Sequence, residues 1–318
     1  MMNEEIVKGD VVKWGDQSQY LSAPIRKQGS QVRPEARLLW ATPDPLGAIA
    51  AVGRMFKGFP TYSLDDITDE DRRLYWEESF KSHLRAPHEF VQFHFFVEGV
   101  TRSHTHQMVR QRTATFAQES LRFAVKECLA NEVPLPPSVM GNEIAEQFWN
   151  QTIAEIDRAY TALVNAGIPA EDARGLLPHA TPTRLHWRTS LMDLIHHAGN
   201  RLCTQAQFEW RILMVSIMKA IRTYHNHGIT QWQFQLIGQP TPQTFAPICY
   251  HTGKCEFKAI FDRPCSIRDR VDANTAAGRP SDEWGIDRMK VIGGVLQDTI
   301  DIGAIQPEEW LLDKDAAR

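Results

Sequence analysis

The sequence predicts an α+β fold, in which a central, mostly antiparallel sheet packs against several helices and a C-terminal appendage follows. Residues 89–98 place Phe93, Phe95 and Val97 on one face by alternation, which is typical of a half-buried strand. Apolar residues recur at helical spacing through 148–163. Strand and helix patterns thus occupy separate stretches of the chain, as in α+β proteins.

The elements expected before residue 89 depend on turn and capping residues. Glycine and proline interrupt residues 1–34, for which we expect no regular structure. We expect a strand at 37–40 and a helix at 46–56, because the proline just before this helix suits a first helical turn. Ser63 and the acidic residues after it predict the start of another helix, since carboxylates stabilise a helix N-terminus.

After residue 98 the pattern is mainly helical. We expect a helix at 101–112 that leads into an extended stretch at 113–116. The helix through 148–163 ends before Gly167, and residues 169–177 predict a short further helix.

A second group of helical residues follows. Ser190 and Asp193 resemble a capping box and predict the start of a long helical region. This region extends to about His227, with a break expected at 199–200. From about Pro240 the composition changes to prolines, then cysteines, then an acidic tail.

Positive charge is concentrated in two segments. The chain has 35 Lys+Arg and 39 Asp+Glu, a formal net charge of -4. Residues 101–122 and 174–211 each carry a net charge of +3 that comes from arginine alone. Arginine binds phosphate and carboxylate groups with two parallel hydrogen bonds, so these segments favour a site for anionic small molecules. The alternative is that these arginines lie on solvated helix faces beside acidic partners.

The composition also bears on location and partners. The apolar runs fall far short of the roughly 20 residues that span a bilayer, and the N-terminus lacks the pattern of a signal peptide. Five cysteines in 318 residues do not make a disulfide scaffold, so we expect a reduced, cytoplasmic location without a membrane partner. The net charge gives no reason to expect nucleic-acid binding.

One segment carries a specific motif. Arg110, Gln111 and Arg112 are followed by seven residues and then Ser120. This pattern resembles the signature of the flavin-dependent thymidylate synthases, Arg-His-Arg, seven residues, Ser, with Gln111 in place of histidine. Further blocks resemble the same family in the same order: Ala41–Pro45, Glu89 with Phe90 where the family has histidine, Thr101-Arg102, Ala173–Pro178, and Arg201 with Gln205–Glu209.

The resemblance implies a fold, ligands and an assembly. It implies the thymidylate-synthase-complementing-protein type of α+β fold and a homotetramer with sites shared between subunits. It also implies an irregular segment at 1–34, a catalytic domain at 35–235 and a C-terminal extension at 236–318. Residues implied to bind FAD are Arg110, Gln111, Arg112, Gln118, Ser190 and His196. Residues implied to bind dUMP are Gln107, Arg110, Gln118, Glu119, Ser120, Leu121, Arg122, Arg174 and Arg201.

The residues themselves are compatible with this chemistry. Arg122 and Arg174 suit a phosphate, and Arg201, the implied catalytic residue, can stabilise negative charge on a uracil ring. Cys128 and Cys203 have no motif around them and are expected to be core thiols. The lack of an evident cysteine nucleophile fits a reaction in which reduced flavin supplies the hydride.

Three functions remain open from the sequence. The first is reductive methylation of dUMP to dTMP, a methyltransferase activity with FAD as cofactor and with NADPH and methylenetetrahydrofolate as co-substrates. The second is a flavin-dependent pyrimidine-nucleotide hydroxymethylase or other one-carbon transferase. The third is a nucleotide- or nucleic-acid-binding protein that retains the fold without turnover.

The C-terminal extension contains a cluster of sulfur and nitrogen ligands. Cys249, His251, Cys255 and Cys265 lie within seventeen positions and would supply the four ligands of a structural zinc site. The alternative is three reduced core cysteines near a surface histidine. A zinc ion would stabilise an appendage that is too small to build its own core.

Overall fold

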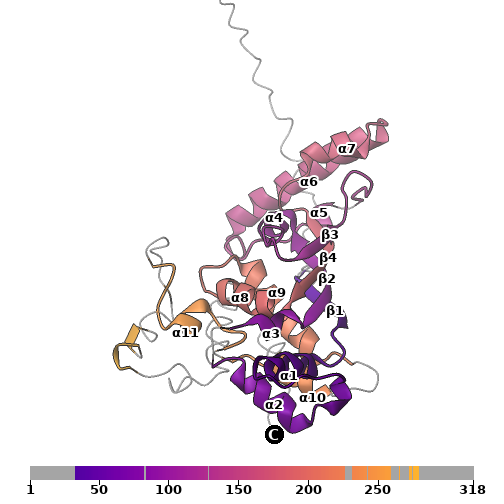
Figure 1. Ribbon diagram of the computed structural model, residues 1–318. Helices are drawn as coiled ribbons and strands as arrows, with labels where there is room; N and C mark the ends of the chain where they lie inside the picture. Colours follow the sequence, from indigo (N-terminus) through magenta and orange to yellow (C-terminus); the bar gives the residue numbers. More distant parts are fainter. Residues whose placement is uncertain are drawn as a thin grey trace, which may run out of the picture.

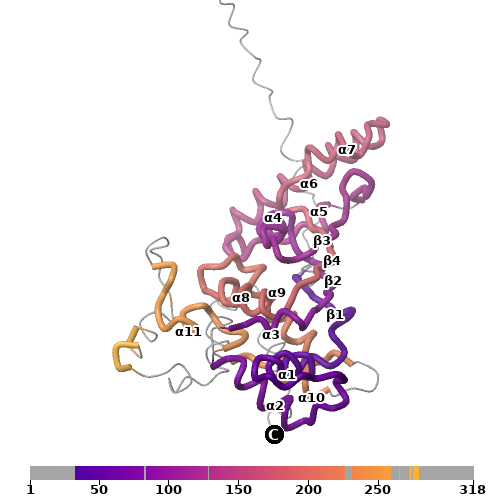
Figure 2. Tube along the Cα trace, viewed as in Figure 1, coloured from indigo at the N-terminus to yellow at the C-terminus, as the bar shows by residue number. Residues whose placement is uncertain are grey.

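The computed structural model describes residues 33–81, 84–127, 129–225, 231–241 and 243–258, together with Cys265, residues 272–273 and residues 275–278. Residues 1–32, Cys128 and most of the C-terminal tail lie outside this set, so the expectations for them stay predictions. Figures 1 and 2 show a sheet near the middle of the molecule, with helices beyond both of its ends.

Four antiparallel strands form the sheet, in the order β1-β2-β4-β3. They are β1 (Glu35–Ala41), β2 (Gln92–Thr101), β3 (Thr115–Gln118) and β4 (Pro182–Ser190). This sheet, with the helices around it, confirms the predicted α+β class.

The strand β4 was missed by the sequence analysis, although it lies inside the sheet between β2 and β3. Its burial alternates, with Leu185, Trp187 and Thr189 buried and the residues between them exposed. An alternating pattern was therefore present in the sequence, but arginine, histidine and threonine positions made it less apolar than that of β2.

The strand β2 confirms the predicted alternation, because Phe93, Phe95 and Val97 are all fully buried. The predicted start was wrong. Glu89 ends the short helix α3 (Ala86–Glu89), and the strand begins only at Gln92.

At the β1 end of the sheet lie α1 (Pro45–Phe56), α2 (Asp69–Glu78) and α10 (Gln231–Ile237), as Figure 1 shows. Asp44 caps α1 by accepting from the backbone N–H of Gly47. The predicted start of the next helix at Ser63 was wrong, because Ser63 caps only a 3-10 turn. Thr68 caps α2 instead, in a capping box with Asp71.

Beyond the other end of the sheet lie α5 (Leu129–Glu132), α6 (Glu143–Asn165) and α7 (Ala170–Ala173). The helix α6 confirms the period seen at 148–163, and Gly167 follows it with a positive φ of 80°. The helix α4 (Arg102–Met108) is shorter than predicted. Arg110, Gln111 and Arg112 therefore lie in a turn between α4 and β3 rather than in a helix.

The core lies where α8 (Leu191–Arg201) and α9 (Phe208–Arg222) cover one face of the sheet (Figure 1). Ser190 caps α8 as predicted, but the helical region is interrupted after Arg201 rather than at 199–200. The short helix α11 (Ile248–Thr252) packs against α8. Among the helices of the described residues, none combines the length and the apolar composition that crossing a membrane requires.

Candidate active site

The helix α4 is held in place at its first residue by an acid from α9. The Thr101 hydroxyl accepts from the backbone N–H of His104 and so caps α4. Glu209 accepts from both the backbone N–H and the hydroxyl of Thr101, at 2.8 Å each. Burial raises the pKa of the Glu209 carboxyl, although the donors from Thr101 and Gln207 act in the opposite direction.

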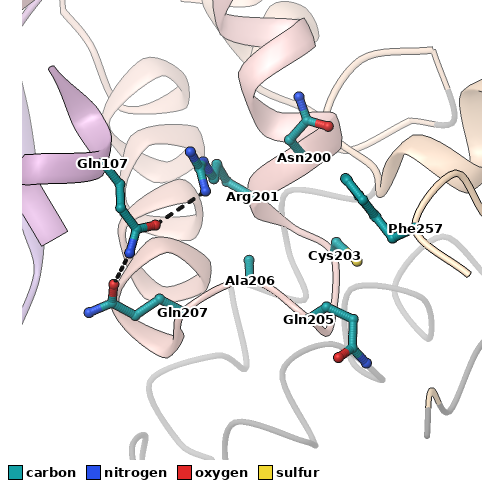
Figure 3. A pocket seen from close by; sticks show the side chains of 8 residues that line it. All are labelled: Gln107, Asn200, Arg201, Cys203, Gln205, Ala206, Gln207 and Phe257. Atoms are coloured by element: carbon teal, nitrogen blue, oxygen red, sulfur yellow. Dashed lines mark hydrogen bonds between the residues drawn. The ribbon is translucent and has the colours of Figure 1, made fainter. Parts of the chain in front are cut away.

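Gln107 and Arg201 meet in a cavity of about 590 Å³ (Figure 3). Gln107 comes from α4 and Arg201 from the last residue of α8. The Arg201 guanidinium donates to Gln107 Oε1 at 3.3 Å and lies 4.8 Å from the centre of the Trp210 ring. No acidic side chain within the described ranges pairs with Arg201, and burial lowers the pKa of its guanidinium. This arginine can therefore direct its charge at an anion in the cavity.

Hydrogen bonds fix the orientation of the Gln107 amide. Its Oε1 accepts from Arg201 and from the Trp210 indole N–H, the latter at 3.2 Å. Its Nε2 donates to Gln207 Oε1 at 2.6 Å, and Gln207 in turn donates to Glu209 at 2.9 Å. Because Oε1 faces two donors, only one of the two amide orientations is compatible with this network.

Two histidines are buried beneath Arg201. The rings of His104 and His197 lie 4.1 Å and 4.6 Å from that of Trp210. Burial, and after it the charge of Arg201, lowers the pKa of each histidine to about 3. Both are neutral at physiological pH, so they add no charge that would compete with Arg201.

A second cavity, of about 400 Å³, brings together another group of the predicted residues. Its predicted members are Gln118, Glu119, Ser120, Leu121 and Arg174, and Arg102, His106, Leu177, Pro178 and His179 complete its lining. Since His106 is the neighbour of Gln107 on α4, the two cavities adjoin the same helix. Seven of the nine predicted substrate residues are thus divided between two cavities, and Arg110 and Arg122 line neither of them.

Charges around this second cavity are partly paired within the chain. Arg122 donates to the Glu171 carboxylate at 2.7 Å, and Arg174 donates to the backbone carbonyl of Glu171 at 3.1 Å. Arg122 is exposed, so its ion pair contributes little to stability and can be exchanged for another anion. Glu119 is paired with Lys126; burial would raise its pKa, but hydrogen bonds from Lys126 and Arg184 lower it overall.

The turn after α4 presents the residues implied to hold a flavin. Arg110 and Arg112 are exposed and form no ion pair with any residue in the described part of the chain. Gln111 Nε2 donates to the Thr189 hydroxyl at 3.2 Å, whereas its buried Oε1 has no partner among the described residues. Two unpaired guanidiniums and an unsatisfied carbonyl oxygen fit a ligand that carries phosphates and a hydrogen-bond donor, as FAD does.

Of the other three implied flavin residues, Gln118 lines the second cavity and two more lie apart from this turn. Ser190 is buried, and its hydroxyl is used to cap α8 and to donate to Asp193 at 3.0 Å. His196 is exposed on α8, one turn before Asn200, which it contacts at 3.4 Å. Of the two, His196 is the more accessible to a ligand.

The predicted zinc site has no support in the described part of the chain. In the part of the chain that the structure describes, which includes all four predicted ligands, no three His, Cys, Asp or Glu side chains form a group that could hold a metal ion. Cys249 and His251 are two positions apart in α11, and such side chains do not face each other on a helix. Burial, and then the nearby charge of Arg85, lowers the pKa of His251 to about 4. Cys249, Cys255 and Cys265 are free thiols.

The expectation for Cys203 needs a correction as well. It is half-buried and lines the Arg201 cavity rather than the core. Among its neighbours are Cys255 and Cys265, which, after burial, help to raise the pKa of its thiol.

The fold and the two arginine-bearing cavities define a protein built to bind anionic small molecules. Comparison with known proteins is more specific, because residues 37–225 match the family described as Thymidylate synthase complementing protein. This match covers more than half of the chain, and the chain belongs to that family. The resemblance predicted from the Arg-Gln-Arg segment is thereby confirmed, and with it the type of α+β fold.

Several curated relatives share a name. A flavin-dependent thymidylate synthase of Geobacter sulfurreducens is 31% identical over 189 residues, covering 58% of this chain and 81% of the relative. A flavin-dependent thymidylate synthase of Pyrococcus furiosus is 36% identical over 234 residues, covering 72% of this chain and 92% of the relative. A crystal structure of Thymidylate Synthase X from Helicobacter pylori with FAD and dUMP aligns with 59% of this chain and 92% of that chain, at 18% identity and a TM-score of 0.49.

Among the residues of the Arg201 cavity and its support that the sequence did not predict, three show where a signal was present or lacking. Trp210 directly follows the Gln205–Glu209 block. On a helix it would lie one turn from Ala206, and this spacing indicates that its side chain shares a face with the block. His104 lies between Arg102 and Gln107, but its ring contact with Trp210 depends on the packing of α4 against α9. Phe257 had no signal in the sequence, because it reaches the cavity only through the docking of the C-terminal extension.

Proposed function

We propose that the protein is a flavin-dependent thymidylate synthase that converts dUMP to dTMP by reductive methylation. Methylenetetrahydrofolate is the carbon donor and NADPH the reductant. The family membership and the names of the relatives support this proposal. The structural observation that carries it is the partly buried Arg201, which faces a cavity without an acidic partner among the described residues.

Arg201 is the group that polarises the uracil ring. For methylation, C5 of uracil must attack an electrophilic carbon, and ionisation at N3 makes the ring electron-rich by placing negative charge on N3 and the ring oxygens. A guanidinium in a partly desolvated cavity stabilises such charge more strongly than one in water. Gln107 and Trp210 hold the guanidinium in one place, so little reorganisation is needed during the reaction.

The second cavity is the part of the site that binds the sugar phosphate. Arg174 and Arg102 line this cavity and supply two positive charges. Ser120 and the backbone around it supply hydroxyl and N–H groups. Arg122 joins this set once its exposed ion pair with Glu171 is exchanged for the phosphate.

Arg110, Gln111 and Arg112 would hold FAD, with His196, Ser190 and Gln118 as further contacts. When bound, FAD supplies the hydride that reduces the transferred carbon to a methyl group. The two arginines bind phosphate oxygens, and the unsatisfied Gln111 Oε1 accepts a hydrogen bond from the ligand. The protein thereby orients the cofactor and polarises the substrate.

The division of the substrate residues between two cavities supports a homo-oligomer. A complete dUMP site can form where the Arg201 cavity of one chain meets the phosphate cavity of another, as in a homotetramer with shared sites. We assign residues 35–235 to the catalytic domain and 236–318 to an extension, and we place the protein in the cytoplasm.

Tritium release from 5-tritiated dUMP, with NADPH and methylenetetrahydrofolate, tests the function. We expect release of tritium and a product with the mass of dTMP. A product with the mass of a hydroxymethyl nucleotide would favour the hydroxymethylase instead, and no turnover by FAD-replete protein would reject both enzymes. Arg201→Ala should abolish turnover and leave FAD bound, whereas the exposed Arg158→Ala in α6 should have no effect.

A further inference from the structure

One wall of the Arg201 cavity comes from outside the family match. The match ends at residue 225, but Phe257 lines the cavity together with Gln107 and Arg201. Figure 3 shows Phe257 on the far side of the cavity from Gln107, reached from the segment that follows α11. The C-terminal extension therefore contributes directly to the space in which Arg201 acts.

Close contacts hold this wall against α8 and the loop after it. A Cβ atom at Gly199 would lie 3.4 Å from the Ile248 side chain and 3.6 Å from its Cα, so α11 approaches α8 closely at this glycine. In the loop, the Thr204 hydroxyl donates to Cys265 Sγ at 3.2 Å. Two separate parts of the extension thus dock beside the residues that line the cavity.

The segment between α11 and Phe257 is also ordered locally. Gly253 takes a positive φ of 73° and ends α11, and the Thr252 hydroxyl donates to the Lys254 carbonyl at 3.1 Å. Cys255 lies near Cys203. The backbone that leads from α11 to Phe257 is therefore held by contacts of its own.

The chemistry of the lining indicates what the cavity binds. Gln107, Asn200, Gln205 and Gln207 supply four carboxamides, Arg201 supplies one positive charge and Phe257 one aromatic face. No carboxylate is among the residues of the described ranges that line this cavity. Carboxamides match the alternating carbonyl and N–H groups at the edge of a lactam ring, and an aromatic face stacks on the plane of such a ring. The volume of about 590 Å³ is suitable for a small molecule.

We propose that Phe257 stacks on the planar lactam ring of a reactant and is a substrate-contacting residue that the C-terminal extension supplies. The inference rests on the proposed function, in which two reactants carry such a ring: dUMP carries uracil and the folate carries a pterin. Stacking on Phe257 orients the ring so that its edge faces the carboxamides and Arg201.

The test compares four variants of the full-length, FAD-loaded protein. Phe257→Ala removes the side chain, Phe257→Leu keeps apolar volume without a ring, and Phe257→Tyr keeps the ring. Glu256→Gln is the matched control, because Glu256 is an exposed neighbour that does not line the cavity. Calorimetric titrations with dUMP and with 5-formyltetrahydrofolate measure the affinity for each ring separately.

We expect Phe257→Ala and Phe257→Leu to weaken the binding of one of the two ligands by about tenfold, as aromatic stacking on a base does. Phe257→Tyr and Glu256→Gln should bind within about twofold of the unsubstituted protein. Identifying which ligand is affected decides whether uracil or pterin stacks on the ring.

The inference is overturned if neither affinity changes, or if leucine binds as well as tyrosine does. It is also overturned if both affinities and the FAD content fall together, since this would indicate a structural role. Its failure is distinguishable from failure of the proposed function. Absence of tritium release by the unsubstituted protein would reject the synthase, while the ring-binding titrations would still be decisive for Phe257.

Discussion

Lowering the pH from 7 to 5 should destabilise the protein through the histidines beneath Arg201. The pKa values of His104 and His197 are each lowered to about 3, from an ordinary value of 6.5. In the unfolded chain both take up a proton near pH 6.5, whereas in the folded protein both stay neutral. Below pH 6.5 the unfolded state therefore binds more protons than the folded state does. The contribution of the two neutral histidines to the free energy of unfolding is complete above pH 6.5 and is lost as the pH falls.

The magnitude follows from the shift. One pH unit below 6.5 costs up to 1.36 kcal/mol per histidine, so reaching pH 5 costs roughly 2 kcal/mol for each and about 4 kcal/mol for the pair. This is a large part of the 5–15 kcal/mol that typically stabilises a folded protein. Glu209, 4.0 Å from His104, acts in the opposite sense, because its raised pKa favours its neutral form as the pH falls.

Urea unfolding at pH 7 and pH 5 measures this effect, and His104→Leu isolates it. At pH 7 the substitution should change the free energy of unfolding little, because neither ring nitrogen of His104 has a hydrogen-bond partner within the described structure. Between pH 7 and pH 5 the variant should lose roughly 2 kcal/mol less than the unsubstituted protein does. His225→Gln, at an exposed position, is the control. An equal loss in His104→Leu and the unsubstituted protein would refute the reasoning.

Three further predictions concern the site and the fold. Trp210→Phe removes the indole N–H that orients the Gln107 amide, and should raise the KM for dUMP by about threefold to tenfold while FAD content stays constant. Glu171→Gln removes the anion paired with Arg122, and steady-state kinetics should give a KM for dUMP about two- to threefold lower; an increase would show that Glu171 assists binding. Gly99→Ala should reduce the free energy of unfolding by about 2 kcal/mol or more, because Gly99 has a φ of 70° and a Cβ there would lie 1.9 Å from a backbone carbonyl oxygen. Urea unfolding that leaves Gly99→Ala unchanged would contradict this account.

Elements with a local cause were predictable from the sequence. The caps at Ser190 and the proline before residue 46 fix helix starts through contacts within a few residues. The alternation of Phe93, Phe95 and Val97 identified the buried face of β2. The start of α2 was predicted wrongly because two local capping signals competed. Ser63 and Thr68 each lie three residues before an acid, Asp66 and Asp71, and Asp71 accepts from the backbone N–H of Thr68 to complete a capping box.

The two cavities could not be predicted from the sequence, because they depend on distant segments. Gln107 and Arg201 are 94 positions apart, and their meeting depends on how α4 and α8 pack around the sheet. The zinc prediction likewise rested on spacing along the chain alone. Spacing along the chain placed Cys249 and His251 together, whereas the helix that they share turns them apart.

The sequence by itself determined the family, the arginines available for anionic ligands and the starts of helices such as α1 and α8, because these follow from residue types and short-range contacts. The tertiary structure decided which of those arginines share a cavity, that Arg201 has an amide and an indole rather than an acid as partners, and that Phe257 from the C-terminal extension reaches the same space. These features arise from packing between segments far apart in the chain, and packing depends on the whole set of side chains at once.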